Sequence, residues 1–221
     1  MKTLKKAFAA AALLVASTAN ATLIDFTNDD HWASNGEKTA SHTYDSGLEV
    51  TITSHPGAFT NKTEGKACST ALTGLMCQTD GLGVRDDEIS FGNEYIKVEF
   101  SQSVDVDWIA FLDLFIEGPN LNTPELAKVR VNGDENSVFG FEGDQTRNTV
   151  GWFQTSGDNF FSGVTMLEFF ADANSGDEIS PGNTDFALAA INVTEVSEPG
   201  TLALMGLGVL ALVGARKRIR S

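Results

Sequence analysis

Cys68 and Cys77 are the only cysteines in the chain, so they are the first residues whose chemistry has to be settled. Such a pair can be a two-thiol metal site, which here lacks partner ligands, two free thiols or a disulfide. Export to an oxidising compartment, argued below, favours the disulfide. Closing the eight-residue loop between them would stabilise the fold by roughly 2–3 kcal/mol. It would also pin the Gly/Ser/Thr-rich segment between Thr53 and Asp80.

Asp86, Asp87 and Glu88 form an acidic run directly after the turn sequence Gly81–Val84. Carboxylate oxygens grouped on a loop are the ligands that Ca²⁺ prefers, and backbone carbonyls of the turn could complete the set. The spacing is not that of an EF-hand loop, so the alternative is a solvated turn before a strand. Calcium is the one cofactor that this sequence suggests.

Asp113 and Glu117 form a second acidic pair. Residues four apart in one strand share a face, and paired carboxylates are the catalytic groups of glycoside hydrolases. Such a site also needs a cleft lined by aromatic side chains, for which Trp32, Trp108 and Trp152 are candidates, although tryptophans of this kind more often lie in the core. Trp108 lies in the apolar run D-W-I-A-F-L and is expected in the core. A secreted hydrolase is therefore one hypothesis, and a carbohydrate-binding module with the same aromatic lining is another.

The remaining reactive side chains carry no recognisable catalytic pattern. His31, His42 and His55 lack the H-x-H or H-x-x-x-H spacing that is typical of zinc sites. The sequence contains neither a G-x-S-x-G motif nor a phosphate-binding loop. We therefore predict no catalytic residues and a protein that is not an enzyme.

The elements that must position these residues are short strands separated by Gly, Asn and Asp turns. Alternating apolar residues predict strands over 22–27, 43–53, 95–100, 104–115, 127–131, 137–141, 149–154, 164–170 and 185–196. Short strands at regular spacing, without long helical periods, are typical of β-sandwiches and jelly rolls. We predict an all-β fold, a jelly-roll-like antiparallel β-sandwich.

The first 21 residues have the composition of a secretory signal peptide. Three lysines precede the apolar run Ala7–Ala16, and Ala19-Asn20-Ala21 has the small-residue pattern of a cleavage site. The mature chain is therefore expected to begin at Thr22, after passage through the Sec translocon.

The segment 196–221 has three parts in a fixed order. The turn-forming Ser197-Glu198-Pro199-Gly200 comes first, and the uncharged run Thr201–Ala215 follows. A basic cluster of Arg216, Lys217, Arg218 and Arg220 comes last. A short apolar span flanked by basic residues predicts a transmembrane helix whose basic end is cytoplasmic, because long Arg and Lys side chains extend the usable span. The alternative, a buried helix of a soluble domain, would show polar residues at helical spacing.

This order of parts resembles the PEP-CTERM sorting signal of Gram-negative bacteria. Glu198 and Pro199 match the family's usual Pro-Glu-Pro triplet, and Ser197 departs from it. The segment from Gly81 to Phe100 is also similar to β-sandwich proteins of that family. The resemblance implies an exosortase partner, a membrane protease that cuts near the motif and removes the anchor.

The segment between the two terminal signals, residues 22–195, has the length of one domain. Three lysines fall in the signal peptide and four basic residues in the tail, which leaves eight Lys and Arg against 30 Asp and Glu in residues 22–198. The resulting formal charge of −22 for residues 22–198 repels nucleic acid and excludes it as a partner.

These observations predict an exported protein that is first anchored in the inner membrane and then released by exosortase. Its destination would be the cell surface or the biofilm matrix, where it would have a structural or adhesive role and could contact extracellular polysaccharide. A carbohydrate-binding module is the leading alternative, and a hydrolase is less favoured. An uncut protein that stays in the inner membrane is a further alternative.

Overall fold

The computed structural model describes residues 21–32, 36–61, 68, 74–85, 87–117, 123–146, 149–155, 160–172 and 185–196. The predicted signal peptide and the predicted transmembrane helix lie outside these ranges. Within them, no helix has the length and apolar character needed to cross a membrane. The strands all belong to one compact unit, Asn20–Val196.

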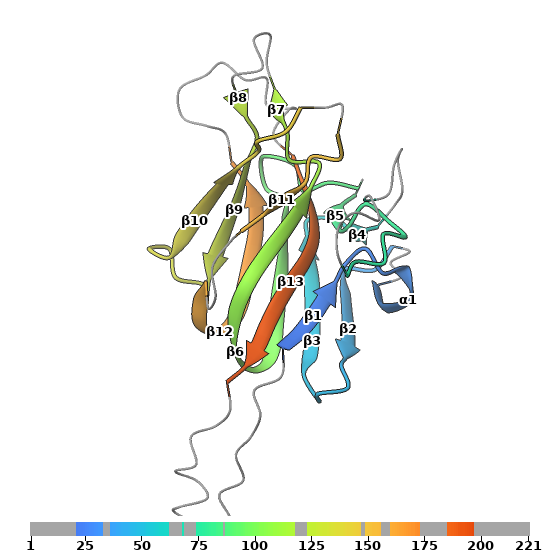
Figure 1. The fold of residues 1–221 in the computed structure, drawn as a ribbon, viewed down its shortest axis with the longest axis vertical. Helices are drawn as coiled ribbons and strands as arrows, with labels where there is room; N and C mark the ends of the chain where they lie inside the picture. The colour runs from blue at the N-terminus through green and yellow to red at the C-terminus, as the bar shows by residue number, and fades with distance from the viewer. Residues whose placement is uncertain are drawn as a thin grey trace, which may run out of the picture. The chain divides into compact units, whose positions relative to one another are not determined.

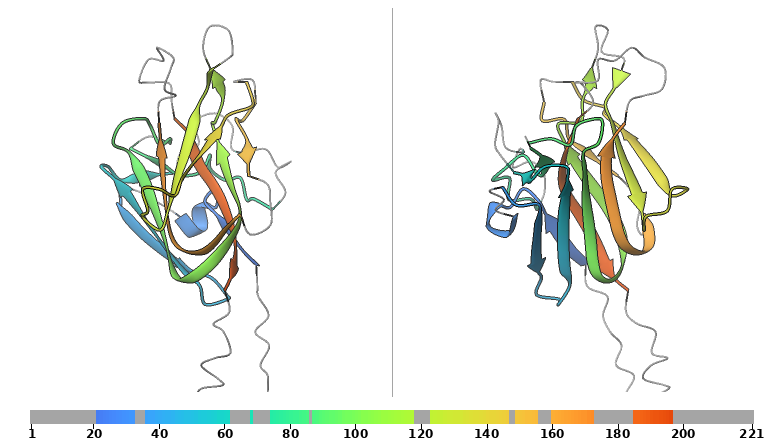
Figure 2. Two further views of the ribbon diagram at one scale, coloured as in Figure 1. Left: turned by 90° about the vertical axis from the view of Figure 1, so that its left-hand side faces the viewer. Right: turned by 180° about the vertical axis from the view of Figure 1, so that it is seen from behind.

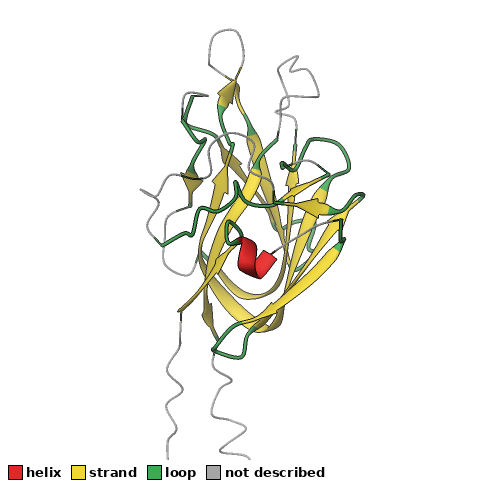
Figure 3. Ribbon diagram, turned by 90° about the vertical axis from the view of Figure 1, so that its right-hand side faces the viewer, coloured by secondary structure: helices red, strands yellow, loops and turns green. Residues whose placement is uncertain are grey.

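The described chain is built almost entirely of strands (Figure 1). In chain order they are β1 (Ala21–Asp25), β2 (Thr39–Thr43), β3 (Glu49–His55), β4 (Phe59–Thr60), β5 (Gly83–Val84), β6 (Tyr95–Leu112), β7 (Ile116–Glu117), β8 (Thr123–Pro124), β9 (Leu126–Val131), β10 (Val138–Glu142), β11 (Phe153–Gln154), β12 (Phe161–Ala171) and β13 (Ala187–Glu195). A single helical turn among the described residues, α1 (Asp29–Trp32), follows β1 and is drawn in red in Figure 3.

Strand β6 takes part in two sets of pairings, one along each half. Residues 95–100 pair with β3 on one side and with the second half of β12 on the other. Residues 104–112 pair with β13, which in turn pairs with β1. The main sheet has the strand order β1-β13-β6-β12-β9-β10, with β2-β3 and β11 added at β6. The strands curve around a common interior, so the fold is β-sandwich-like (Figure 2).

The two layers meet through phenylalanine rings. Phe111, in the second half of β6, lies 5.6 Å from Phe141 of β10 and 6.2 Å from Phe169 of β12, measured between ring centroids. It also lies 5.3 Å from Phe186, at right angles. Phe111, Phe169 and Phe186 are fully buried. Because Phe141 and Phe169 belong to the layer of β9, β10 and β12, these contacts join that layer to the one containing β13.

The predicted all-β, antiparallel class is confirmed, whereas the jelly-roll connectivity stays a finer prediction. The expected strands 95–100 and 104–115 are one continuous strand that ends at Leu112. The expected strand 43–53 is instead the end of β2, a turn and most of β3, because Gly47 has a φ of +91° and donates to the Tyr44 carbonyl at 2.8 Å. Alternation detects extended segments, but it does not locate the bends within them.

Candidate functional site

One broad surface of the sheet combines aromatic, cationic and acidic side chains. Side chains alternate along each strand, and in β3, the first half of β6, β9 and the second half of β12 every second residue is buried. The intervening residues point away from the core, and we call this set the outer face: Thr51, Thr53, His55, Tyr95, Lys97, Glu99, Leu126, Lys128, Arg130, Met166, Glu168 and Phe170.

An aromatic row crosses the outer face at right angles to the strands. His55 and Tyr95 are cross-strand partners, and their rings stack with centroids 5.0 Å apart and planes inclined by 18°. Phe169 pairs with Ile96, so the same register places Phe170 beside Tyr95. The Arg130 guanidinium lies over the Phe170 ring, 5.1 Å from its centroid, at cation–π distance. Three adjacent strands thus contribute rings to one line.

Ion pairs fix the charged side chains of the same surface. Lys97 Nζ lies 2.9 Å from Glu99 Oε2. Arg130 pairs with Glu168, its cross-strand partner. Lys128 pairs with Asp172, the residue after β12. Side-chain exposure in these pairs ranges from 19% for Glu168 to 44% for Glu99, so each pair is open to a bound molecule.

A shallow depression of about 250 Å³ lies at one end of the outer face. It is lined by Glu49, Thr51, Glu99, Phe100 and Ser101. The Glu49 backbone N–H donates to Ser101 Oγ at 3.0 Å, which fixes that hydroxyl. The lining offers carboxylates and hydroxyls, which are groups that hydrogen-bond polar ligands.

A second group of polar residues gathers where β6 ends and β13 begins. Leu112 pairs with Ala187, and the Ile89 N–H donates to the Phe186 carbonyl at 2.7 Å, so three segments of the chain meet there. The mutual electrostatic effects of their carboxyl groups show that they are close together. We call these residues the acidic cluster: Asp80, Asp87, Glu88, Asp113 and Asp185.

Two glycines permit this convergence. A Cβ at Gly83 would lie 2.0 Å from the Glu88 nitrogen, so only glycine allows the turn to fold back on itself. Gly81 has a φ of +104°, and a Cβ there would lie 2.7 Å from the Leu188 carbonyl oxygen. The G-L-G sequence is therefore required by close backbone approach.

Crowding raises the pKa of two carboxyl groups in the acidic cluster. Burial, followed by the charges of Asp185 and Asp113, holds the pKa of Glu88 well above its ordinary value. Burial, followed by the charges of Asp80, Asp87 and Asp185, raises the pKa of Asp113 to about 7. Both effects disfavour the ionised form. The folded protein therefore binds protons here at pH values where the unfolded chain has released them.

The calcium prediction for Asp86, Asp87 and Glu88 stays a prediction. Asp86 lies outside the described residues, whereas Asp87 and Glu88 lie in the half-buried turn before Ile89. Within the described part of the chain, no group of three or more His, Cys, Asp or Glu side chains is arranged to hold a metal ion.

The expected placement of Asp113 and Glu117 on one strand is wrong. β6 ends at Leu112, Asp113 has a φ of +55°, and Glu117 belongs to the separate strand β7. The positive φ breaks the extended backbone, so the two residues do not share a strand face. The shared strand that was expected to pair these two carboxylates, as in a glycoside hydrolase, is therefore not formed.

Of the three tryptophans considered for a ligand cleft, Trp32 lies in the core. Trp32 is fully buried, with its ring 5.2 Å from that of Phe26. Trp152 and Trp108 are both partly buried against a small cluster that includes Ala187 and Ala190. The proposal of Trp32 as a sugar-contacting residue is wrong, because a side chain without exposed surface cannot contact a ligand.

Two histidines, His31 and His42, lie in contact in the fold, although their spacing in the sequence does not predict it. His31 of α1 and His42 of β2 stack at 3.9 Å between centroids, and the Tyr44 ring meets His42 edge-on at 4.7 Å. Burial, and then the neighbouring His31, lower the pKa of His42. The nitrogen lone pairs of stacked imidazoles lie in parallel planes, so they do not converge on one metal ion. His55 lies apart, on the outer face.

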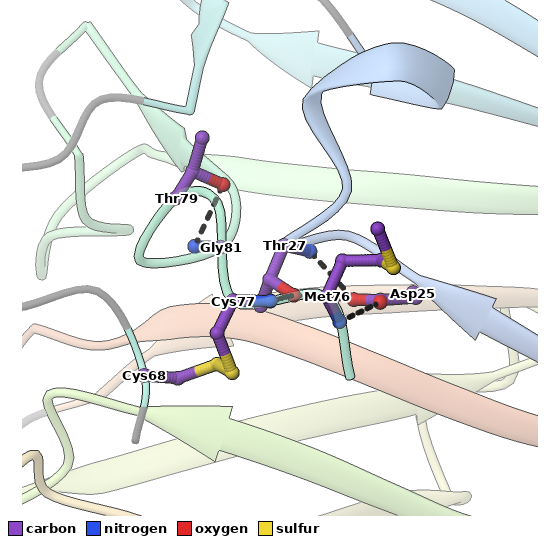
Figure 4. The surroundings of a disulfide bond; sticks show 7 residues. All are labelled: Asp25, Thr27, Cys68, Met76, Cys77, Thr79 and Gly81. Atoms are coloured by element: carbon purple, nitrogen blue, oxygen red, sulfur yellow. Dashed lines mark hydrogen bonds between the residues drawn. A yellow bond between two sulfur atoms is a disulfide. The ribbon is translucent and has the colours of Figure 1, made fainter. Parts of the chain in front are cut away.

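The predicted disulfide is confirmed, and it fastens a loop to the other side of the sheet (Figure 4). Cys68 is buried against Ala110, Leu112 and Ala187, residues of the layer formed by β6 and β13. The Asp25 carboxylate accepts a hydrogen bond from the Met76 N–H at 2.7 Å. The layer containing β13 is therefore covered on its outer side, unlike the outer face.

The end of β13 leads directly into the predicted sorting segment. Gln102 Nε2 donates to Glu195 Oε2 at 2.6 Å, and the Val196 N–H donates to the Ser103 carbonyl at 3.2 Å. Residues 195–218 match the PEP-CTERM protein-sorting motif.

The chain carries a PEP-CTERM sorting motif. The resemblance inferred from the sequence is thereby confirmed. The matched span includes Ser197, Glu198 and Pro199 and the basic residues up to Arg218, and Arg220 lies beyond it. All of these lie outside the described residues. The PEP-CTERM motif implies an exported protein with a membrane-anchored precursor that exosortase processes.

Solved structures resemble the chain only distantly. A DUF4465 family protein from Bacteroides ovatus has 10% identity and a TM-score of 0.36, covering 81% of this chain and 100% of its own. Two mutants of CBM29-2, from studies of ligand recognition by family 29 carbohydrate-binding modules, have 16% identity and TM-scores of 0.26. They cover 80% of this chain and 90% and 89% of their own. These likenesses carry no argument about the function of this chain. No curated protein matches it.

Replacing both cysteines by serine is expected to lower the free energy of unfolding by roughly 2–3 kcal/mol, because the reduced loop gains entropy in the unfolded state. Urea denaturation of the double variant and of wild type measures the difference. The variant Met76→Ala, in the same loop with an exposed side chain, is the control. Equal stability of the double variant and wild type would contradict the expectation.

The stability of the domain is expected to fall as pH rises from about 4 to above 7. The unfolded carboxyl of Asp113 titrates at 3.8 and the folded one at about 7, so the folded state holds the extra proton across this window. The pKa of Glu88, raised further, extends the loss to higher pH. Urea midpoints measured at a series of pH values report this slope.

The variant Glu88→Gln is expected to flatten the slope, whereas Glu142→Gln, at an exposed position of β10, should leave it unchanged. A stability that rises across the window would rule out the raised pKa values. Repeating the series with millimolar Ca²⁺ also tests the calcium prediction. Stability regained at high pH by wild type but not by Glu88→Gln would support calcium, and identical curves would count against it.

Proposed function

We propose that this protein is a non-enzymatic structural or adhesive protein of the cell surface or extracellular matrix, released there by exosortase. The observation that carries the proposal is the position of the PEP-CTERM motif, which begins at the last residue of β13. The only described residue between β13 and Ser197 is Val196, and it is hydrogen-bonded to the domain. Cleavage near Glu198 would therefore release the whole folded domain.

The pairing of the terminal strands fits this route. Ala21 of β1 and Thr194 of β13 are cross-strand partners, so the points where the two sorting signals join the domain lie side by side. β13 spans nine residues. At about 3.4 Å a residue, the acidic cluster at its beginning lies about 30 Å from that junction. The anchored precursor would thus present the cluster end away from its attachment points.

A non-enzymatic role is supported by the surroundings of Asp113. A carboxyl group with a pKa near 7 is a candidate general acid or base. Besides burial, the groups that raise its pKa are three other aspartates, Asp80, Asp87 and Asp185. That arrangement, in the described part of the chain, differs from a sugar-cleaving cleft. Binding on the outer face is the better-supported activity.

Sorting is tested by peptide mapping of the C-terminus in inner-membrane and extracellular fractions of the host. Wild type outside the inner membrane should end near Glu198, whereas Pro199→Ala should keep Arg216–Ser221 and stay in the membrane. The matched variant Ser197→Pro, which restores the family's usual triplet, should be processed at least as fully as wild type. Wild-type protein that keeps its basic tail outside the inner membrane would contradict the proposal.

The non-enzymatic assignment has a separate test. Purified protein incubated with neutral and acidic polysaccharides is expected to release no new reducing ends above the buffer control. Turnover by wild type that is lost in Asp113→Asn would contradict the non-enzymatic assignment and would support the hydrolase hypothesis. Turnover that survives in Asp113→Asn would indicate a contaminating enzyme or a different site, which the variant Glu88→Gln would then probe.

A further inference from the structure

We propose that the outer face binds a neutral polysaccharide, with the glycan lying across strands β3, β6, β12 and β9. The proposal rests on the proposed function, since an exported surface protein meets polysaccharide outside the cell. It differs from the tryptophan-lined site that the sequence offered as an alternative, since the outer face lies on the opposite side of the sheet from Trp108 and Trp152.

The aromatic row supplies the apolar part of the site. His55 is exposed, and Tyr95 and Phe170 are partly exposed, although each could have been a small polar residue at an outward strand position. Sugar rings have one apolar face of C–H groups, which packs on aromatic side chains. Neighbouring strands lie about 4.8 Å apart, close to the length of one hexose in an extended glycan. Successive sugars can therefore meet successive strands along the row.

The ion pairs supply the polar part. Lys97, Lys128 and Arg130 offer N–H donors, and Glu99, Glu168 and Asp172 offer carboxylate acceptors. A sugar hydroxyl both donates and accepts, so a fixed pair of cation and carboxylate satisfies it completely. Partly exposed ion pairs contribute little to folding stability. The presence of three such pairs on one surface is therefore poorly explained by a role in stability, and a role in binding explains it better.

The charges on and around the outer face favour a neutral glycan over an anionic one. Three of the eight basic residues between the terminal signals lie on this surface, and each is paired with a carboxylate. The surface is therefore close to neutral, although residues 22–198 carry a formal charge of −22. An anionic polysaccharide would be repelled by that charge and would meet carboxylates at every pair. A neutral chain avoids both penalties.

The depression beside Thr51 and Glu99 extends the site along β6 toward Ser101. Its hydroxyl and carboxylate lining matches the chemistry of the ion pairs. Ligand sites in proteins are usually larger than about 300 Å³, so this space suits one sugar unit of a longer chain rather than a separate small ligand.

The test is native affinity electrophoresis of the exported protein through gels containing neutral polysaccharides (β-glucan, mannan, xylan and dextran) or polyanionic alginate. Retardation by at least one neutral polymer and none by alginate is expected. Tyr95→Ala and Lys97→Gln should each weaken binding by about tenfold or more, because each removes one of the few groups that orient a sugar.

Two matched variants control for the chemistry removed. Phe139→Ala removes an aromatic ring that is 41% exposed on β10, and Lys38→Gln removes a lysine that donates to the Pro56 carbonyl. Both lie off the outer face and should bind like wild type. Circular dichroism verifies folding, and Lys97→Gln decides the outcome if Tyr95→Ala does not fold.

Absence of retardation by every neutral polymer, retardation by alginate alone, or equal binding by Lys97→Gln and wild type would each overturn the proposal. The C-terminal mapping described above is independent of all three results. Correct sorting without binding would therefore refute the proposed glycan site and leave the proposed surface or matrix location standing.

Discussion

The fold depends on one strand serving two layers. β6 pairs through residues 95–100 with β3 and β12, and through residues 104–112 with β13. Its buried side chains change layer along its length, and Phe111 completes the change by packing against rings of the opposite layer. Shifting β6 by one residue would turn both halves inside out, because side chains alternate along a strand. Burial on both layers therefore fixes the register of the whole sheet.

This shared strand makes the two outward surfaces different. Beside its second half, Ala110, Leu112 and Ala190 are buried in a small cluster with Cys68 of the disulfide-bonded loop, and Trp108 and Trp152 pack against the same cluster. Beside its first half, the outward residues are long, charged or aromatic, and they keep part of their surface exposed. One side of the sheet is thus covered by a loop, and the other carries polar and aromatic side chains that are partly exposed. The uncovered side is the one suited to binding a ligand.

Local periodicity predicted the strands, because each strand depends on a short stretch of sequence. The pairing of the two cysteines was predicted from their number and from the oxidising compartment that export implies. Periodicity could not predict which strands become neighbours. His31 and His42 stack, and Tyr95 meets His55, only because of long-range strand pairing. The sequence left Trp32 as either a core or a ligand-contacting residue because aromatic side chains serve both, and only the packing of α1 against Phe26 decides between them. The outer face carries no local motif at all.

The acidic cluster shows how topology can impose an electrostatic cost. Asp113 follows β6 and Asp185 precedes β13, and because these strands are antiparallel neighbours their two ends are adjacent. The turn carrying Glu88 is held at the same place by backbone hydrogen bonds to β13. Like charges brought together in this way oppose folding once they ionise. The core of the sandwich must offset that cost. The contribution of these carboxyls to stability is therefore largest where they keep their protons, and it is lost as they ionise in neutral and alkaline surroundings.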